Sequence, residues 1–338
     1  MAHPFVANSN ILHRSFAAQP KRVVSASGAS LFLESGQEVL DASAGPAVSV
    51  LGHGRAEVNQ AILKQLETLP YLYSGARFTC DATEELASLL LAHRPGGLSK
   101  AIFVNSGSEA TDAALKLATQ YWHERGKPEK RFVIARKQSY HGNTIGALCV
   151  SGHRSRRAKY KDWLSSNVSF VDPCFAYRLK RAHESNDDYL RRLEWQLESE
   201  ILRLGPENVS MFVAETVSGT TLGCLPPVPG YFKAVRRLCD KYDILLMLDE
   251  VSTSIGASAT PCSLDLDLTS NGRLCAAWGK QAQCMPGNKR ESPALTSKLL
   301  ARHLEVALSP YRECCYTRAY LTRSPPEQEV WLMVTLSR

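Results

Sequence analysis

The sequence has no apolar run long enough to cross a membrane, because no apolar stretch reaches 18 residues. Its first ten residues, MAHPFVANSN, also lack the basic region and long apolar run of a secretory leader. These two absences predict that the protein has neither a membrane-spanning helix nor a signal peptide. They predict a soluble protein of the cytoplasm that has no membrane partner.

Paired metal-ligand cysteines are also missing. The chain has ten cysteines, but none forms a Cys-x-x-Cys pair. Cys262, Cys275 and Cys284 lack the spacing that zinc sites use. The pattern therefore predicts neither a disulfide scaffold nor a metal centre, and we interpret the thiols as structural or incidental.

Two nucleotide-binding motifs are absent as well. No stretch matches G-x-x-x-x-G-K-[ST], and the segment GHGRAE at 52–57 lacks the third glycine of a dinucleotide motif. Charge of one sign is not concentrated either, since acids and bases alternate in RLKRAHESNDDYLRRLEWQLESE at 178–200 and the net charge is only +7. This mixture is typical of a solvated helix face, so we expect no nucleic-acid partner.

What the sequence does contain is an alternation of short apolar runs with helical stretches. Such alternation predicts an α/β fold with a mostly parallel sheet and helices on both faces. Residues 22–41 predict a small antiparallel meander before it, with turns at Gly28 and Gly36. The expected strands are 101–105, 131–135, 167–172, 211–216 and 244–250, and the expected helices are 57–69, 83–93, 108–125, 187–203 and 229–242.

The alternation fails after residue 251. Residues 252–338 hold five of the ten cysteines and show no convincing order of strand and helix. SKLLARHLEVAL at 297–308 is the one predicted helix, and WLMVTL at 331–336 is a short apolar run without an obvious strand partner.

Polar residues follow four of the predicted strands, and ligands of parallel sheets gather at these strand ends. The turn Ser106-Gly107-Ser108 precedes a helix, whose free amides and positive dipole end suit a phosphate. The alternative is that Ser108 only caps this helix. A phosphorylated cofactor smaller than a dinucleotide fits this turn better than a nucleotide.

The other strand ends offer an aromatic ring, an imidazole and acids. Tyr140, His141 and Gly142 follow the second strand; taken alone, the first two are more often packing and hydrogen-bonding residues than site residues. Asp249 ends a strongly apolar strand. A pyridinium nitrogen at about 4 Å would stabilise its charge by about 4 kcal/mol at a dielectric constant of about 20. A simple turn cap is the alternative.

Together these segments resemble the class III aminotransferases, pyridoxal-phosphate enzymes of the type I fold. The resemblance runs over residues 22–251 and rests on NSGSEATDAALKLA, YHGNTIGAL, AETVSG and PPVPGYFKAVRRLCDKYDILLMLDEV. It implies amino-group transfer from an amine or amino acid to a 2-oxo acid or aldehyde, and a homodimer. It also implies three parts: a small-domain segment at 1–45, the cofactor-binding large domain at 46–251, and an unmatched tail at 252–338.

The resemblance assigns roles to particular residues. Ser106, Gly107 and Ser108 would hold the phosphate of pyridoxal 5'-phosphate, with His141 and Gly142 near it. Tyr140 would stack on the ring, and Val251 would pack on the opposite face. Glu215 would lie near the ring hydroxyl and Asp249 would pair with the ring nitrogen.

The lysine that holds the cofactor covalently in this family has no clear match. Lys280, in AAWGKQA, is the candidate because it follows Asp249 by 31 positions and comes after a glycine. The residues around it do not read as a strand, and we predict that it is not selectively labelled by the cofactor. Two alternatives to an enzyme therefore stay open: an inactive cofactor-binding remnant, and a gene product whose tail comes from an altered reading frame or retained intron.

Overall fold

The structure of the protein is a computed structural model that describes residues 10–13, 20–42, 49, 51–92, 98–219, 221–250, 274–278 and 331–335. Two predicted site residues, Val251 and Lys280, lie outside these ranges, as does the predicted helix at 297–308. For 274–278 and 331–335 the backbone alone is described.

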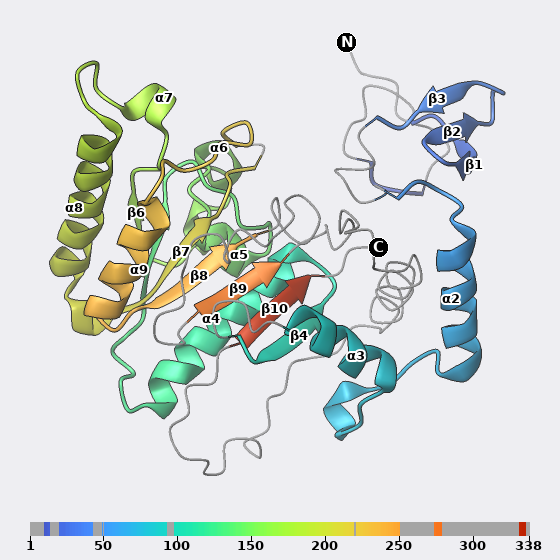
Figure 1. Ribbon diagram of the computed structural model, residues 1–338, viewed down its shortest axis with the longest axis horizontal. Helices are drawn as coiled ribbons and strands as arrows, with labels where there is room; N and C mark the ends of the chain where they lie inside the picture. The colour runs from blue at the N-terminus through green and yellow to red at the C-terminus, as the bar shows by residue number, and fades with distance from the viewer. Residues whose placement is uncertain are drawn as a thin grey trace.

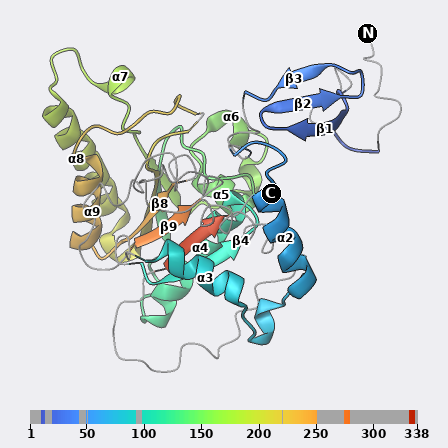
Figure 2. The ribbon, with the colours of Figure 1, turned by 45° about the vertical axis from the view of Figure 1, so that its right-hand side comes forward.

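The N-terminal part forms a small antiparallel sheet. Its strands are β1 (Val23–Ser27), β2 (Ser30–Leu33) and β3 (Glu38–Leu40), in that order. Gly28 and Gly36 take positive φ angles of 56° and 83° at the two turns, a conformation that glycine adopts without strain. The predicted meander is confirmed, and Figures 1 and 2 show it set apart from the main sheet.

Two helices link the small sheet to the main one. They are α2 (Ala56–Thr68) and α3 (Asp81–Leu90), with a 3₁₀ turn at Ser74–Ala76 between them. Both begin within two residues of their predicted starts. Leu86 and Leu90 of α3 are buried, whereas Leu63 and Leu66 of α2 are among the exposed apolar residues.

Within the described residues, the main sheet has seven strands, all parallel, in the order β4-β10-β9-β8-β7-β5-β6. The strands predicted in residues 101–250 are confirmed to within a few residues. Their bounds are β4 (Lys100–Val104), β5 (Phe132–Arg136), β6 (Val168–Val171), β7 (Val209–Glu215) and β8 (Leu245–Asp249).

Helices cover both faces of this sheet, as predicted (Figure 1). On one face pack α8 (Asn186–Leu204) and α9 (Tyr231–Lys241), and on the other packs α4 (Gly107–Glu124). The shorter helical segments are α5 (Ile145–Val150), α6 (Arg154–Arg157), α7 (Ala176–Leu179) and the 3₁₀ turns Lys161–Trp163 and Pro206–Asn208.

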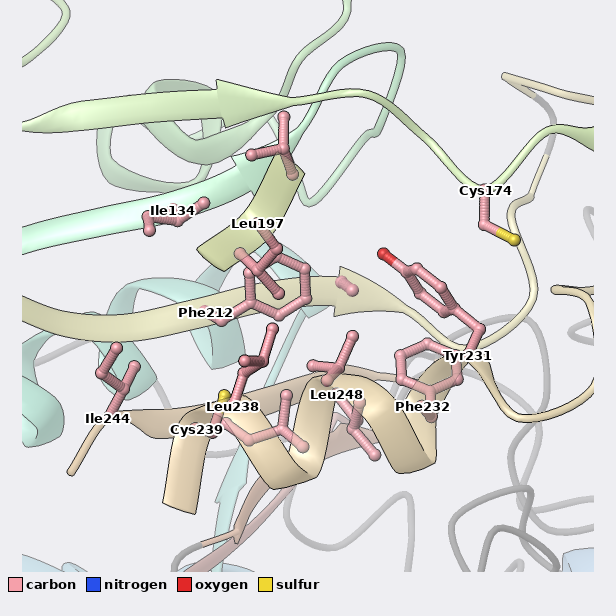
Figure 3. Packing of buried hydrophobic residues seen from close by; sticks show 14 of the residues in the cluster. Ile134, Cys174, Leu197, Phe212, Tyr231, Phe232, Leu238, Cys239, Ile244 and Leu248 are labelled. Carbon is pink, nitrogen blue, oxygen red and sulfur yellow. The ribbon is translucent and has the colours of Figure 1, made fainter. Parts of the chain in front are cut away.

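Alternation along β7 explains the two cores. Phe212 belongs to the cluster that contains Leu197 of α8 and Leu238 of α9 (Figure 3). Met211 belongs to the opposite cluster, with alanines of α4 that allow the helix to approach closely. Every residue of β7 is buried, which is typical of a central parallel strand.

A buried lysine links the segments at the amino ends of the parallel strands, here called the amino edge of the sheet. Lys130 is 4% exposed, and its Nζ donates to the carbonyl oxygens of Val209 at 3.0 Å and Asp243 at 2.8 Å. Carbonyls of Pro206 and Tyr242 lie 3.0 and 3.4 Å from the same atom. The indole of Trp122 lies 4.6 Å from it, so this charge is well satisfied.

Two strands come from the segment after residue 251. They are β9 (Leu274–Trp278), which pairs with β8, and β10 (Trp331–Thr335), which lies between β9 and β4. Two sequence interpretations are therefore wrong: a strand does precede Lys280, and the run WLMVTL does have partners. Pattern analysis missed both because a strand inside a parallel sheet is defined by distant neighbours rather than by local alternation.

No helix in the described part of the chain is long and apolar enough to cross a membrane.

Candidate functional site

The carboxyl ends of the parallel strands β4, β5, β7 and β8 lie on the same side of the sheet, here called its carboxyl edge. The structure joins the turn after β4 to the turn after β5 through Ser108 and Asn143, and it joins the turn after β5 to β8 through His141 and Asp249. Glu215 and Asp249 are partners in the register of β7 and β8. The predicted site residues within the described ranges thus form one cluster.

The turn after β4 is an open helix N-terminus. Ser106 is the N-cap, because its Oγ accepts from the amide of Glu109 at 3.2 Å. The carboxylate of Glu109 accepts in turn from the amide of Asn105 at 2.7 Å. Within the described residues, the amides of Gly107 and Ser108 have no hydrogen-bond acceptor. Two open donors at the positive end of an 18-residue helix suit an anion.

The alternative that Ser108 caps this helix is therefore wrong, since Ser106 does so. The hydroxyl of Ser108 instead donates to Oδ1 of Asn143 at 2.9 Å and accepts from the amide of Asn143 at 3.0 Å. Sequence analysis did not assign Asn143. Its signal was weak, because an asparagine after a glycine reads as ordinary turn chemistry.

Gly142 allows these two turns to touch. Its φ is 137°, and a Cβ built on it would lie 2.7 Å from Oγ and 2.8 Å from Cα of Ser108. A side chain at this position would therefore separate the turn after β5 from the start of α4.

His141 and Asp249 form a buried pair at the centre of the edge. Nδ1 of His141 lies 2.8 Å from Oδ2 of Asp249, and the histidine side chain is completely buried. The backbone of His141 is also held, because Thr111 donates to its carbonyl and its amide donates to Ser151. Nε2 of His141 has no hydrogen-bond partner among the described residues. The contact of His141 with Asp249 favours a site role for the histidine over packing alone.

Glu215 is the second buried acid, 7% exposed at the end of β7. Its Oε1 accepts from the amide of Gly219 at 3.2 Å, whereas its Oε2 has no partner in the described part of the chain. Burial raises the pKa of this carboxyl above its ordinary value, and the charge of Asp249 raises it further. His141 and the guanidinium of Arg136 oppose that rise in the pKa of Glu215.

Tyr140 lies half-buried beside this cluster. The guanidinium carbon of Arg156 lies 4.5 Å from the centre of its ring, a cation–π contact. Sequence analysis assigned neither Arg156 nor Arg136. Arg156 stands in the basic run RSRR, which is typical of a solvated surface. Arg136 directly follows the apolar run FVIA and has no motif of its own.

Comparison with known proteins gives a consistent family. A family profile described as aminotransferase class-III matches residues 14–264. An uncharacterized aminotransferase of Schizosaccharomyces pombe (strain 972 / ATCC 24843) is 48% identical over 242 residues, which cover 72% of this chain and 52% of that protein. Gamma-aminobutyrate transaminase 1 of Oryza sativa subsp. indica is 33% identical over 270 residues, 79% of this chain and 51% of that protein. The chain spans about half the length of the curated relatives it matches.

Solved structures agree on the fold. A thermostable omega transaminase variant engineered for synthesis of bulky amines has a TM-score of 0.72 at 27% identity, covering 78% of this chain and 60% of that one. An omega transaminase of Pseudomonas jessenii in complex with PMP has a TM-score of 0.75 at 24% identity, covering 89% and 71%. The second likeness bears on fold alone, and together they confirm the predicted type I transaminase fold. Since the profile and the S. pombe relative both cover most of this chain, it belongs to the class-III aminotransferase family.

Proposed function

We propose that the carboxyl edge of the sheet is the pyridoxal 5'-phosphate site of a transaminase. The reaction transfers an amino group from an amine or amino acid to a 2-oxo acid or aldehyde. The observation that carries the proposal is the buried His141–Asp249 pair beside the open amides of Gly107 and Ser108. The open amides match the phosphate at one end of this cofactor, and the buried acid matches the protonated ring nitrogen at its other end.

The residues of the edge fit this cofactor in charge and in hydrogen bonding. The amides of Gly107 and Ser108 would bind the phosphate, while Ser106 keeps the helix start in place. Asp249, oriented by His141, would hold a proton on the ring nitrogen, and Tyr140 would stack on the ring face. Bound there, the cofactor supplies an electron sink for the carbon that loses its proton.

A direct titration tests the cofactor site. We expect the purified chain to bind pyridoxal 5'-phosphate with 1:1 stoichiometry, measured by quenching of tryptophan fluorescence and by equilibrium dialysis. Free phosphate should compete, since the helix start is the proposed anchor. Pyridoxal without phosphate serves as the matched ligand control and should bind much more weakly. Equal affinity for both ligands contradicts the proposed anchor.

A second candidate function is cofactor binding without turnover. It is favoured because the family profile ends at residue 264, before Lys280. The opposing observation is that Ala277 of β9 pairs with Asp249, and Lys280 follows Ala277 by three positions in the sequence. Borohydride reduction followed by peptide mass analysis separates the two, with Lys280→Ala as control. Specific labelling of Lys280 supports the transaminase, whereas binding without labelling supports the second candidate.

We also propose that the chain is a homodimer. Exposed apolar side chains gather on and after α2, and burying them would stabilise an assembly. They are Leu63, Leu66, Tyr71, Tyr73 and Phe78. Sedimentation velocity over a range of concentrations tests this, and a monomer at every concentration contradicts it.

A further inference from the structure

Arg136 is a buried cation at the carboxyl end of β5 that the proposed reaction does not use. It is 5% exposed. Its Nη2 donates to the main-chain carbonyl of Glu215 at 2.6 Å, which links the ends of the neighbouring strands β5 and β7. Its guanidinium carbon lies 5.9 Å from the ring centre of Tyr231, at the start of α9. The cation therefore sits beside the second acid of the site.

Two polar atoms next to this contact lack partners among the described residues. They are Nε of Arg136, a donor, and Oε2 of Glu215, an acceptor when the acid is ionised. Both residues line one small hollow, together with Pro173, Leu222 and Leu225, and its volume is about that of one water molecule.

The charged neighbours of Glu215 come from the two strands beside β7, which are β5 and β8. Burial and the carboxylate of Asp249 on β8 both favour the protonated acid. His141 after β5 and Arg136 on β5 favour the ionised form. His141 is paired with Asp249, whereas Arg136 is the cation that also holds the main chain of Glu215, through its hydrogen bond to the carbonyl oxygen. The remaining titratable groups next to Arg136 are Tyr231 and the thiol of Cys174.

We propose that Arg136 is a positioning residue for Glu215: it fixes the main chain at the end of β7 and keeps the buried carboxyl ionised beside Asp249. An ionised carboxylate accepts hydrogen bonds and donates none. Arg136 thereby determines whether Glu215 presents an acceptor or a donor to whatever binds at this edge. The inference rests on the proposed function only for the identity of that ligand.

Infrared titration of the cofactor-free chain tests this directly. The carbonyl band of a protonated carboxyl is assigned to Glu215 by its loss in Glu215→Gln. In the unmodified chain we expect this band to be absent at pH 7 and to appear on acidification. In Arg136→Gln its midpoint should rise by about one pH unit, the effect of removing a nearby opposite charge. Arg136→Lys keeps the positive charge, so its midpoint should lie close to that of the unmodified chain.

A structural role alone would give a different result. Arg236 on α9 is buried to a similar degree, at 4%, and pairs with Asp240, so Arg236→Gln is the matched control. It should lower the thermal midpoint without moving the Glu215 band. An Arg136→Gln midpoint within about 0.3 pH units of the unmodified chain overturns the proposal.

The proposal stays testable if Arg136→Gln does not fold. A protonated Glu215 in the unmodified chain at pH 7 contradicts it without any variant. The titration contains no cofactor, so it also separates this proposal from the proposed function. Failure to bind pyridoxal 5'-phosphate removes the cofactor site, and an unmoved Glu215 band removes the role of Arg136.

Discussion

The amino ends and the carboxyl ends of the parallel strands differ in how far their buried charged groups find hydrogen-bond partners. At the amino edge, Lys130 is surrounded by main-chain carbonyls and an indole. At the carboxyl edge, His141, Glu215 and Arg136 each keep one buried polar atom without a partner in the described part of the chain. Burial of charge alone therefore does not mark a site. Several such atoms at the ends of neighbouring strands do, because a stable core seldom tolerates them without a ligand or water, whereas single ones also occur elsewhere, as at Gln196 of α8.

Breaking the amino edge should have the largest effect on stability. Lys130→Ala leaves several buried carbonyls without their donor, so we expect the free energy of unfolding to fall by about 3 kcal/mol. Urea denaturation followed by circular dichroism measures it. Lys127→Ala removes a nearby but half-exposed ion pair with Asp243 and should cost less than about 1 kcal/mol. Equal losses of unfolding free energy in the two variants would contradict the special importance of the buried Lys130.

Breaking the carboxyl edge should act on binding more than on folding. Asp249→Asn keeps the size of the side chain but removes the charge that faces His141 and the proposed ring nitrogen. We expect the Kd for pyridoxal 5'-phosphate to rise about 10- to 100-fold, in line with about 1.5–3 kcal/mol for a charge-assisted hydrogen bond. Fluorescence titration measures the change. An unchanged Kd would return Asp249 to a turn-capping role.

The helix start sharpens the comparison because it serves both folding and binding. Ser106→Ala removes the N-cap of α4 and should lower the free energy of unfolding by about 1 kcal/mol. Ser106→Asp keeps a capping oxygen but places a negative charge beside the phosphate, so stability should persist while cofactor affinity falls. Thermal melts and the same titration separate the two effects. A tighter-binding Ser106→Asp variant contradicts a phosphate at this turn.

The smallest effect is expected at the rim of the site. Arg156 contacts the ring of Tyr140 but is exposed, where such a contact contributes about 0.5–1 kcal/mol. Arg156→Ala should therefore weaken cofactor binding by about two- to fivefold, and Arg156→Lys should recover part of the loss. Arg154→Ala, on the same short helix, is the control and should leave the Kd unchanged.

Much of the fold was predictable because its signals are local. Apolar runs and helical periodicity predicted the strands and helices between residues 101 and 250, and the positive φ of Gly28 and Gly36 follows from turn chemistry. β9 and β10 were not predictable in this way. Their strand character depends on β8 and β4, which are far away in sequence.

The site was predictable in its members but not in its contacts. The ends of parallel strands must meet, so Ser108, Glu215 and Asp249 were expected at one edge. The pairing of His141 with Asp249 joins residues 108 positions apart and has no local signature. Arg136 escaped notice because a strand-end arginine normally reaches solvent, and only the structure shows it turned against Glu215.

The position of β10 in the sheet has a consequence for how the protein is made. Strand β4, which carries the turn with Ser106 and Ser108, pairs within the described residues with β10 alone. On the ribosome, β4 emerges more than 200 residues before Thr335. Until synthesis reaches that point, this edge of the sheet waits unpaired, a state that favours association with other chains. Translation speed and chaperone access during this interval are therefore expected to influence the yield of native protein.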